Sequence, residues 1–255
     1  AVNAALAAGG GAERNAIPGY AFESLKVVNH RVTNMPLRTS ALRSLGAFGN
    51  VFALESSIDD LARLANADPL QFRLAHLEDV RGRRVLETLQ QLLQDPPDTT
   101  DTSTGRGIAY ARYKNSGAWC AVAAHISVTD RIIVERLTVV ADIGCVINPD
   151  GARNQLEGGA LQACSWALLE AVPIDPQEGP SATDWTSYPI MSFSDQPKVH
   201  VELIAADDQP SLGAGECAQG PVVAAIANAL RDAVGLRVRD LPLTRERLMQ
   251  AAADS

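Results

Sequence analysis

Residues 211–221 read SLGAGECAQGP, and the apolar stretch VVAAIANAL follows at 222–230. Three glycines within eight residues allow the backbone to reach positive φ and let a ligand approach it closely. Pro221 tolerates the first position of a helix, because its missing N–H is not needed there. Apolar residues then recur at helical spacing, and Gly235 is a stop signal. The sequence therefore predicts a glycine-rich turn that opens into an apolar helix.

Glu216 is a lone carboxylate in this turn, and its sequence neighbours are Leu212, Cys217 and Ala218 rather than cations. Apolar surroundings disfavour the charged form of a carboxylate, which suits a proton acceptor near neutral pH. We therefore expect Glu216 to be a candidate general base. The alternative is a solvated glutamate in an ordinary surface turn.

The composition narrows the class of protein. The chain has 255 residues, a formal net charge of −8, 46% hydrophobic and 20% charged residues, which is typical of a globular protein. The negative charge and the lack of a long basic run argue against nucleic-acid binding. The four cysteines form no CxxC pair and the four histidines are scattered, so we expect no intrinsic metal site.

Periodicity and turn signals divide the chain into segments. We expect a helical and mixed segment at 1–94, a linker at 95–106 and an α+β segment at 107–255. The expected helices are at 51–65, 69–76, 84–93, 152–170, 222–234 and from 245, and the expected strands are within 20–37 and at 106–114, 118–128, 131–142 and 199–204. The pattern predicts an α+β fold with mixed sheets and packed helices.

Two further segments combine polar side chains with glycine. Arg43 lies in a loop with Gly46, and Gln155 lies close to Gly158 and Gly159 within a predicted helix. Arg43 could bind ligand oxygens through its planar guanidinium or could be a loop-packing arginine. Gln155 could bind a heterocycle through its amide or could be an ordinary helix-surface side chain. The G-x-G-x-x-G and Walker A patterns are not matched, which disfavours a standard nucleotide fold.

Three motifs together resemble one family. They are LGAGECAQGPVVAAIANA at 212–229, DIGCVINPDG with NQLEGG at 142–159, and LRSLG with IDDLA at 42–62. The chain resembles the molybdenum-cofactor subunit of the xanthine dehydrogenase and aldehyde oxidase superfamily, most like the isoquinoline 1-oxidoreductase and nicotinate dehydrogenase type of large subunit. The resemblance covers nearly the whole chain from about residue 20, and it implies the second half of such a subunit.

The resemblance also assigns roles to residues. It implies that Glu216, in the Gly-x-Gly-Glu motif, is the base of a hydroxylation in which water supplies the oxygen. It places Arg43 beside the molybdenum and pterin, and Gln155 against the pterin. The remaining expected contacts are Gly213, Ala214 and Gly215 near the metal, and Leu45 on the substrate wall. The family usually has phenylalanine at the position of Leu45, which weakens any inference of aromatic stacking with substrate.

The implied cofactor is molybdopterin cytosine dinucleotide, whose dithiolene holds the molybdenum, so no protein side chain is expected as a metal ligand. The family's first half is not in this sequence. We therefore expect a companion chain with that half, a 2Fe–2S subunit, and a FAD or cytochrome c subunit as an optional further partner. The substrate would be an N-heteroaromatic compound or an aldehyde. The alternative is a non-catalytic scaffold or assembly half subunit that binds anions or partner chains.

The expected location is the cytoplasm, with a membrane-associated or periplasmic complex as the alternative. The chain begins AVN rather than with Met, so a split subunit and a cleavage product both remain open.

Overall fold

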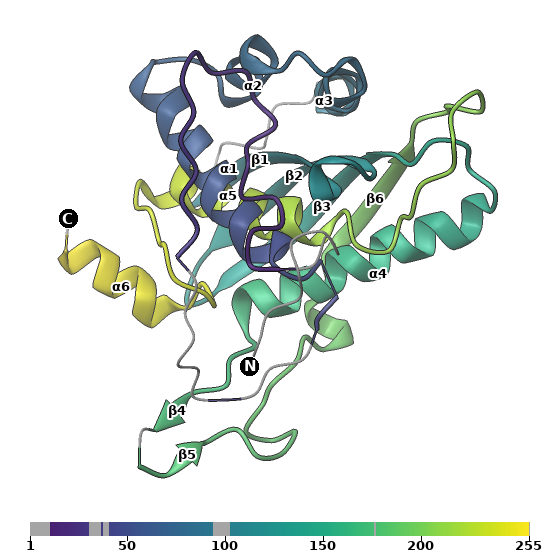
Figure 1. Ribbon diagram of the computed structural model, residues 1–255. Helices are drawn as coiled ribbons and strands as arrows, with labels where there is room; N and C mark the ends of the chain where they lie inside the picture. The colour runs from purple at the N-terminus through teal and green to yellow at the C-terminus, as the bar shows by residue number, and fades with distance from the viewer. Residues whose placement is uncertain (1–10, 31–36, 38–40, 94–102, 176, 255) are drawn as a thin grey trace.

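The computed structural model describes residues 11–30, 37, 41–93, 103–175 and 177–254. Its centre is a four-stranded sheet with helices on both faces (Figure 1). The helices are α1 (Ala47–Leu64), α2 (Pro69–His76), α3 (Val80–Leu92), α4 (Pro149–Leu168), α5 (Gln219–Val234) and α6 (Arg245–Ala253). The strands are β1 (Thr104–Arg112), β2 (Trp119–Val128), β3 (Ile132–Asp142), β4 (Ile174–Asp175), β5 (Gly179–Pro180) and β6 (Lys198–Leu203), with 3-10 turns η2 (Tyr113–Asn115) and η3 (Phe193–Asp195).

The central sheet has the strand order β1-β2-β3-β6. Its first three strands pair antiparallel in sequence order, whereas β6 pairs parallel with β3. A parallel neighbour needs a long crossover, and the chain between β3 and β6 contains α4 and the β4–β5 arm. The predicted α+β fold with a mixed sheet is confirmed.

Alternate residues of β2 face two separate hydrophobic cores. Cys120 and Val122 pack into the core that contains α4 and α5, whereas Ala121 and Ala123 pack into the core that contains α2 and α3. Because both faces are covered, β2 is apolar at successive positions rather than at every second one. Figure 1 shows α2 and α3 above the sheet and α4 below it.

Strand β1 lies unusually close to α5 because it carries two glycines. A Cβ on Gly107 would lie 2.1 Å from both Ala225 O and Ala229 N, and a Cβ on Gly105 would lie 2.2 Å from Ala229 O. Any side chain at these positions would push the helix away from the sheet. The contact therefore fixes α5, which follows directly on the glycine-rich turn.

The ends of several helices follow signals that are visible in the sequence. Asp68 caps α2 by accepting hydrogen bonds from two backbone N–H groups, directly before Pro69. Asn148 caps α4 by accepting a bond from one backbone N–H, and α5 ends at Gly235, whose φ is 75°. Helix α5 begins at Gln219, slightly before the start that Pro221 predicts.

The strands predicted within 20–37 are absent from the described part of that range. Residues 21–30 and 37 lie in no helix or strand, and residues 31–36 lie outside the described residues. A strand exists only where a neighbour shares its hydrogen bonds, and no strand of the described chain lies beside this segment. The prediction is wrong for the described residues, because alternation of residue types does not supply a partner.

The division at 95–106 stays a prediction. Helix α1, before that division, packs against α5, which follows it. At their contact, a Cβ on Gly220 would lie 2.8 Å from the Cβ of Val51. This close contact holds the first turn of α5 against α1.

Candidate functional site

Arg43 joins three segments that are far apart in the sequence. Its Nε donates to the carbonyl oxygen of Gly215 at 2.9 Å, and its Nη1 donates to Gln162 Oε1 at 3.0 Å. Its Nη2 donates to the carbonyl oxygen of Gln155 at 3.2 Å. Gln155 and Gln162 belong to α4, and Gly215 belongs to the glycine-rich turn. The structure therefore brings together the three segments that the sequence singled out.

Glu216 lies beside Arg43, and its carboxylate is held by two donors. Ser44 N donates to Oε1 at 3.0 Å, and Tyr113 OH donates to Oε2 at 2.9 Å. Arg14 Nη1 donates in turn to Tyr113 OH at 2.8 Å. The carboxylate is half-buried, and no ion pair joins it to a cation within the described residues. Its surroundings are therefore more polar than the sequence predicted, but they leave it uncompensated by a charge.

The loop that carries Arg43 has an unusual backbone. Ser44 and Leu45 have φ values of 56° and 48°, in the left-handed region that residues with a Cβ rarely adopt. Such strain persists only where neighbouring contacts enforce it. Here Ser44 N and Oγ bond to the side chain and the backbone carbonyl of Glu216, so the strained turn directs two donors at one residue.

Leu45 lies on the wall of a cavity of about 690 Å³ between α1 and the C-terminal half of α4. Arg43 shares this wall, and Phe48 and Trp166 line the cavity with their rings in edge contact, 5.3 Å between centroids. The leucine thus faces a space with aromatic walls, although it is not aromatic itself.

The three small residues before Glu216 differ in what surrounds them. Gly213 is exposed, and an added Cβ would meet nothing within 4 Å. An added Cβ on Gly215 would lie 3.5 Å from Gln155 Oε1, whereas Ala214 packs against the core. Cys217, directly after Glu216, is buried. Ala214 and Cys217 therefore anchor the turn to the core, whereas the backbone at Gly213 is uncovered.

Gln155 and the glycine-rich turn leave an amide side chain and backbone uncovered next to each other. The Gln155 side chain is exposed and makes no hydrogen bond to any described residue, so its amide can both donate and accept. It lies beside Gly215, and Gly158 in the same helix has open space where a Cβ would be. This donor and acceptor set suits the polar edge of a pterin, and the Arg43 guanidinium lies close by, on the carbonyl oxygens of Gly215 and Gln155.

The end of β3 supports the glycine-rich turn from the other side. Asp142 Oδ1 accepts a hydrogen bond from Gly144 N at 3.0 Å, and Arg81 forms an ion pair with the same carboxylate. Leu212 N then donates to the carbonyl oxygen of Ile143 at 2.7 Å. Burial alone would raise the pKa of Asp142, but these bonds outweigh burial and hold that pKa below its usual value.

Tyr113 is a stable proton donor to Glu216. Burial, followed by the hydrogen bond to Glu216 and its negative charge, raises the pKa of Tyr113 to about 12. The phenol therefore keeps its proton throughout the neutral range and holds the carboxylate in one orientation.

The sequence did not reveal the roles of Ser44, Tyr113 and Gln219. Ser44 acts chiefly through a backbone N–H, which no residue pattern shows, and Tyr113 is 103 residues from Glu216 in the sequence. Gln219 is fully buried and donates from Nε2 to Gly215 O at 3.1 Å. The position of Tyr113 at the end of the strand predicted at 106–114 was the available signal, because polar residues at strand ends often face a site.

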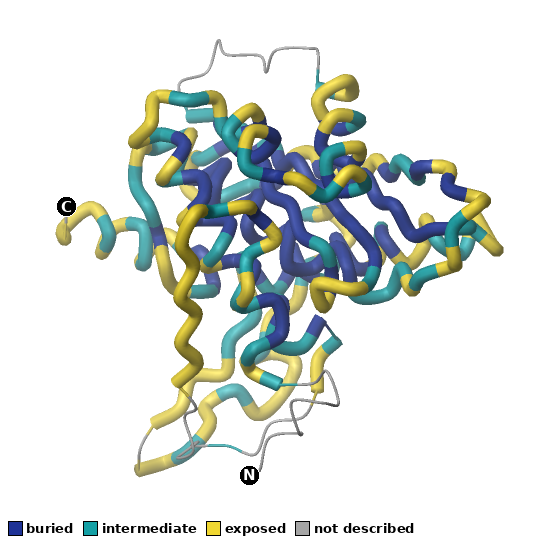
Figure 2. Tube along the Cα trace, turned by 45° about the horizontal axis from the view of Figure 1, so that its top comes forward, coloured by how far each residue is buried: buried dark blue, intermediate teal, exposed yellow. Residues whose placement is uncertain are grey.

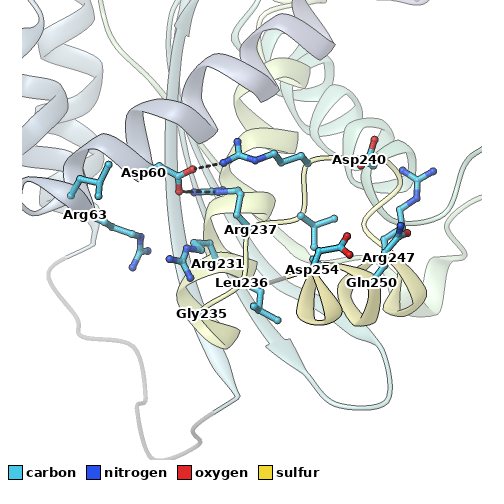
Figure 3. A pocket seen from close by; sticks show the side chains of 14 residues that line it. Asp60, Arg63, Arg231, Gly235, Leu236, Arg237, Asp240, Arg247, Gln250 and Asp254 are labelled. Atoms are coloured by element: carbon cyan, nitrogen blue, oxygen red, sulfur yellow. Dashed lines mark hydrogen bonds and ion pairs between the residues drawn. The ribbon is translucent and has the colours of Figure 1, made fainter.

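A larger cavity, of about 1050 Å³, lies at the C-terminal ends of α1 and α5 (Figure 3). It contains several arginines, but Arg237 and Arg239 both pair with Asp60, and Arg63 pairs with Asp59 and Asp232. Basic residues at helix C-termini also stabilise the helices themselves. We assign this cavity to a structural ion-pair network. Within the described residues, no group of three histidines, cysteines or acidic residues is placed to hold a metal ion.

The fold places the chain in a known structural class. Quinoline 2-oxidoreductase from Pseudomonas putida 86 has a TM-score of 0.74 with 14% identity, over 84% of this chain and 53% of that chain. The aldehyde oxidoreductase of Desulfovibrio gigas has a TM-score of 0.71 with 16% identity, over 84% of this chain and 42% of that one. These likenesses show a shared fold.

The family follows from the sequence comparisons. The model of the molybdopterin cofactor-binding domain matches residues 46–197, and the chain belongs to this family. The nicotinate dehydrogenase of Pseudomonas putida has a subunit that is 36% identical over 94% of this chain, and the beta subunit of isoquinoline 1-oxidoreductase from Brevundimonas diminuta is 32% identical over 79% of it. The predicted resemblance to molybdenum-cofactor subunits of the xanthine dehydrogenase family is confirmed. The chain spans only 21% and 26% of the length of these two relatives.

Proposed function

We propose that this chain is part of the catalytic subunit of a molybdenum hydroxylase. The reaction is the oxidative hydroxylation of an N-heteroaromatic compound or an aldehyde, with water as the source of oxygen. One observation carries the proposal: Glu216, a carboxylate without a paired cation in the described chain, lies beside Arg43 and the open face of Gln155. The 36% identity to a nicotinate dehydrogenase subunit and the 32% identity to an isoquinoline 1-oxidoreductase subunit support the substrate class.

The residues of this chain divide the work of binding between them. Gln155 would hold the edge of the pterin through its free amide, and Gly213, Ala214 and Gly215 would let the cofactor approach the backbone. Arg43 would stabilise negative charge on the cofactor. When bound, the molybdenum cofactor would supply two-electron oxidation and the transfer of a water-derived oxygen. The cytosine dinucleotide form of the cofactor belongs to this proposal.

Glu216 would act as the proton acceptor at Oε1 or Oε2. Ser44 N and Tyr113 OH orient the carboxylate, so it is already in position before each turnover. Neither donor carries a positive charge, so no ion pair within the described chain competes with proton transfer to the carboxylate. Leu45 would shape the substrate side of the site from its position on the 690 Å³ cavity.

Relatives of this chain carry the names of subunits, which supports an assembly with further subunits. We propose a companion with the remainder of the molybdenum subunit and a 2Fe–2S subunit that accepts the electrons, with a FAD or cytochrome c subunit as a further electron carrier. A cytoplasmic location is part of the proposal, with a membrane-associated or periplasmic complex as the alternative. No helix in the described ranges is both long enough and apolar enough to cross a membrane.

Metal and pterin analysis of the purified complex tests the proposal. We expect about one molybdenum and one pterin for each copy of this chain, and turnover of N-heteroaromatic compounds or aldehydes. A complex that contains the companion but neither molybdenum nor pterin would contradict the proposal and would support the non-catalytic scaffold instead.

A further inference from the structure

Residues 25–30, LKVVNH, form a segment whose backbone is unusually open; we name it the edge segment. It lies in no helix or strand, and each of its six residues is exposed. Figure 2 shows it as an elongated run of exposed chain along the outside of the molecule. Its backbone and side chains make no hydrogen bond to any described residue. As far as the described residues go, the peptide groups of 25–30 are therefore available for pairing.

The composition of the edge segment is that of a strand. Leu25, Val27 and Val28 expose 54%, 42% and 58% of their surface. Single exposed apolar residues are common, but three within four positions of a stretched backbone resemble an uncovered interaction site. The two valines are β-branched, and six residues is a normal strand length.

The edge segment is anchored at its N-terminal side, so it is not a loose tail. Tyr20 is buried and its OH donates to Glu55 Oε1 at 2.7 Å. Ala21 N donates to the carbonyl oxygen of His76 at 2.7 Å. Further along the chain, Arg43 is fixed at the candidate site by three hydrogen bonds. The fold therefore holds the edge segment between two well-packed regions while leaving it without a neighbour in the described chain.

We propose that the edge segment is an interaction surface that pairs, as a β-strand, with a strand from the remainder of the molybdenum subunit. This inference rests on the proposed function, which includes that companion. The choice of partner follows from length, because this chain matches only 21% and 26% of its two relatives, and about four-fifths and three-quarters of their lengths lie outside it. Added strands gain their affinity from main-chain hydrogen bonds, which suits a segment whose peptide groups bond to no described residue.

The pairing has a defined geometry. Successive side chains of a strand point to opposite faces, so Leu25 and Val27 would share one face and Lys26 and Val28 the other. A strand paired on one side uses the N–H groups of every second residue. Either the odd-numbered or the even-numbered amides are bonded, and the other set stays open.

Amide hydrogen exchange of the purified complex tests the pairing. We expect exchange at alternate residues of 25–30 to be at least about 100-fold slower than in an unfolded peptide of the same sequence. The intervening amides should exchange much faster. Fast exchange at all six positions would overturn the proposal, and so would slow exchange that also appears in this chain alone and depends on its concentration, which would indicate pairing between two copies.

Two neighbouring proline variants form a matched pair. Proline removes one N–H, and no N–H of the edge segment is bonded within the described chain, so neither Val27→Pro nor Val28→Pro removes an internal bond of this chain. One of the two should weaken association with the companion by about tenfold or more, and the other much less. Equal effects, or none, would contradict alternate pairing.

These measurements separate the inference from the proposed function. Neither exchange nor association requires molybdenum or turnover. If the complex contains cofactor and turns over substrate while residues 25–30 exchange freely, only the pairing is wrong. If the edge segment is protected in a complex without cofactor, the pairing stands and the proposed function fails.

Discussion

Two glutamates of this chain differ in how fully their charge is satisfied. Glu55 is completely buried and accepts hydrogen bonds from Tyr20, Arg73 and a backbone N–H, with an ion pair of 2.8 Å to Arg73. Glu216 is half-buried and accepts one bond from Tyr113 and one from a backbone N–H, with no paired cation in the described chain. The contacts of Glu55 satisfy its charge within the core. The contacts of Glu216 orient its carboxylate but leave it available as a proton acceptor.

Removal of the cation at Glu55 should produce the largest loss of stability. Arg73→Met leaves a buried carboxylate without its partner, so we expect the free energy of unfolding to fall by about 3–5 kcal/mol. Urea unfolding measures this loss. Arg63→Met is the matched control, because Arg63 is partly exposed and its buried partner Asp59 keeps a second cation, Arg237, so the loss should be about 1 kcal/mol. Equal losses in the two variants would show that Glu55 is not held as described.

Two tyrosine variants sharpen the comparison, since each removes one O–H donor from one glutamate. Tyr20→Phe should lower the free energy of unfolding by about 1.5–3 kcal/mol and leave turnover per folded molecule unchanged. Tyr113→Phe should lower kcat by about tenfold, because Glu216 loses its orientation. Steady-state kinetics gives kcat, and urea unfolding gives the free energy of unfolding, for each of the two variants. A normal kcat in Tyr113→Phe would show that the phenol has no positioning role.

The two glutamates also show which features could be predicted from the sequence and which could not. The α+β fold and most helices were predictable, because periodicity, caps and glycine motifs are local signals. That Arg43, Gln155 and Glu216 lie close together was implied by the family resemblance and not by these local patterns. The ion pair at Glu55 was not, since its partners come from other elements. Tyr113 was missed for the same reason. The strands expected within 20–37 are absent from the described part of that range, because a strand depends on a neighbour that alternation does not reveal.

Asp142 supports the glycine-rich turn, so protonation of its carboxylate should lower the stability of the fold at acidic pH. Its pKa is lowered, so its stabilising effect is present above the usual carboxyl pKa of about 4 and is lost as the pH falls through the lowered value. Asp142→Asn should be less stable by about 1–2 kcal/mol at pH 7 and should lose less stability than the original chain between about pH 5 and pH 2. Unfolding curves across this range measure the difference; parallel acid curves would contradict it.

A further expected effect is an alkaline one at Tyr113. Because burial and Glu216 raise its pKa to about 12, the folded state keeps this proton above about pH 10, where the unfolded state releases it. The resulting stabilisation is complete below about pH 10 and is lost as the pH rises towards 12. Tyr113→Phe should therefore show a shallower loss of stability over that interval in alkaline unfolding. An unchanged slope would place the phenol in ordinary solvent.

The most direct test of the account is turnover by Glu216→Gln in the purified complex, with molybdenum and pterin measured in the same sample. Glutamine keeps the size of the side chain and an acceptor oxygen but cannot take the proton. We expect kcat to fall by about a thousandfold while the cofactor content stays the same. Full turnover by this variant with its cofactor bound would contradict the assignment of Glu216 as the base.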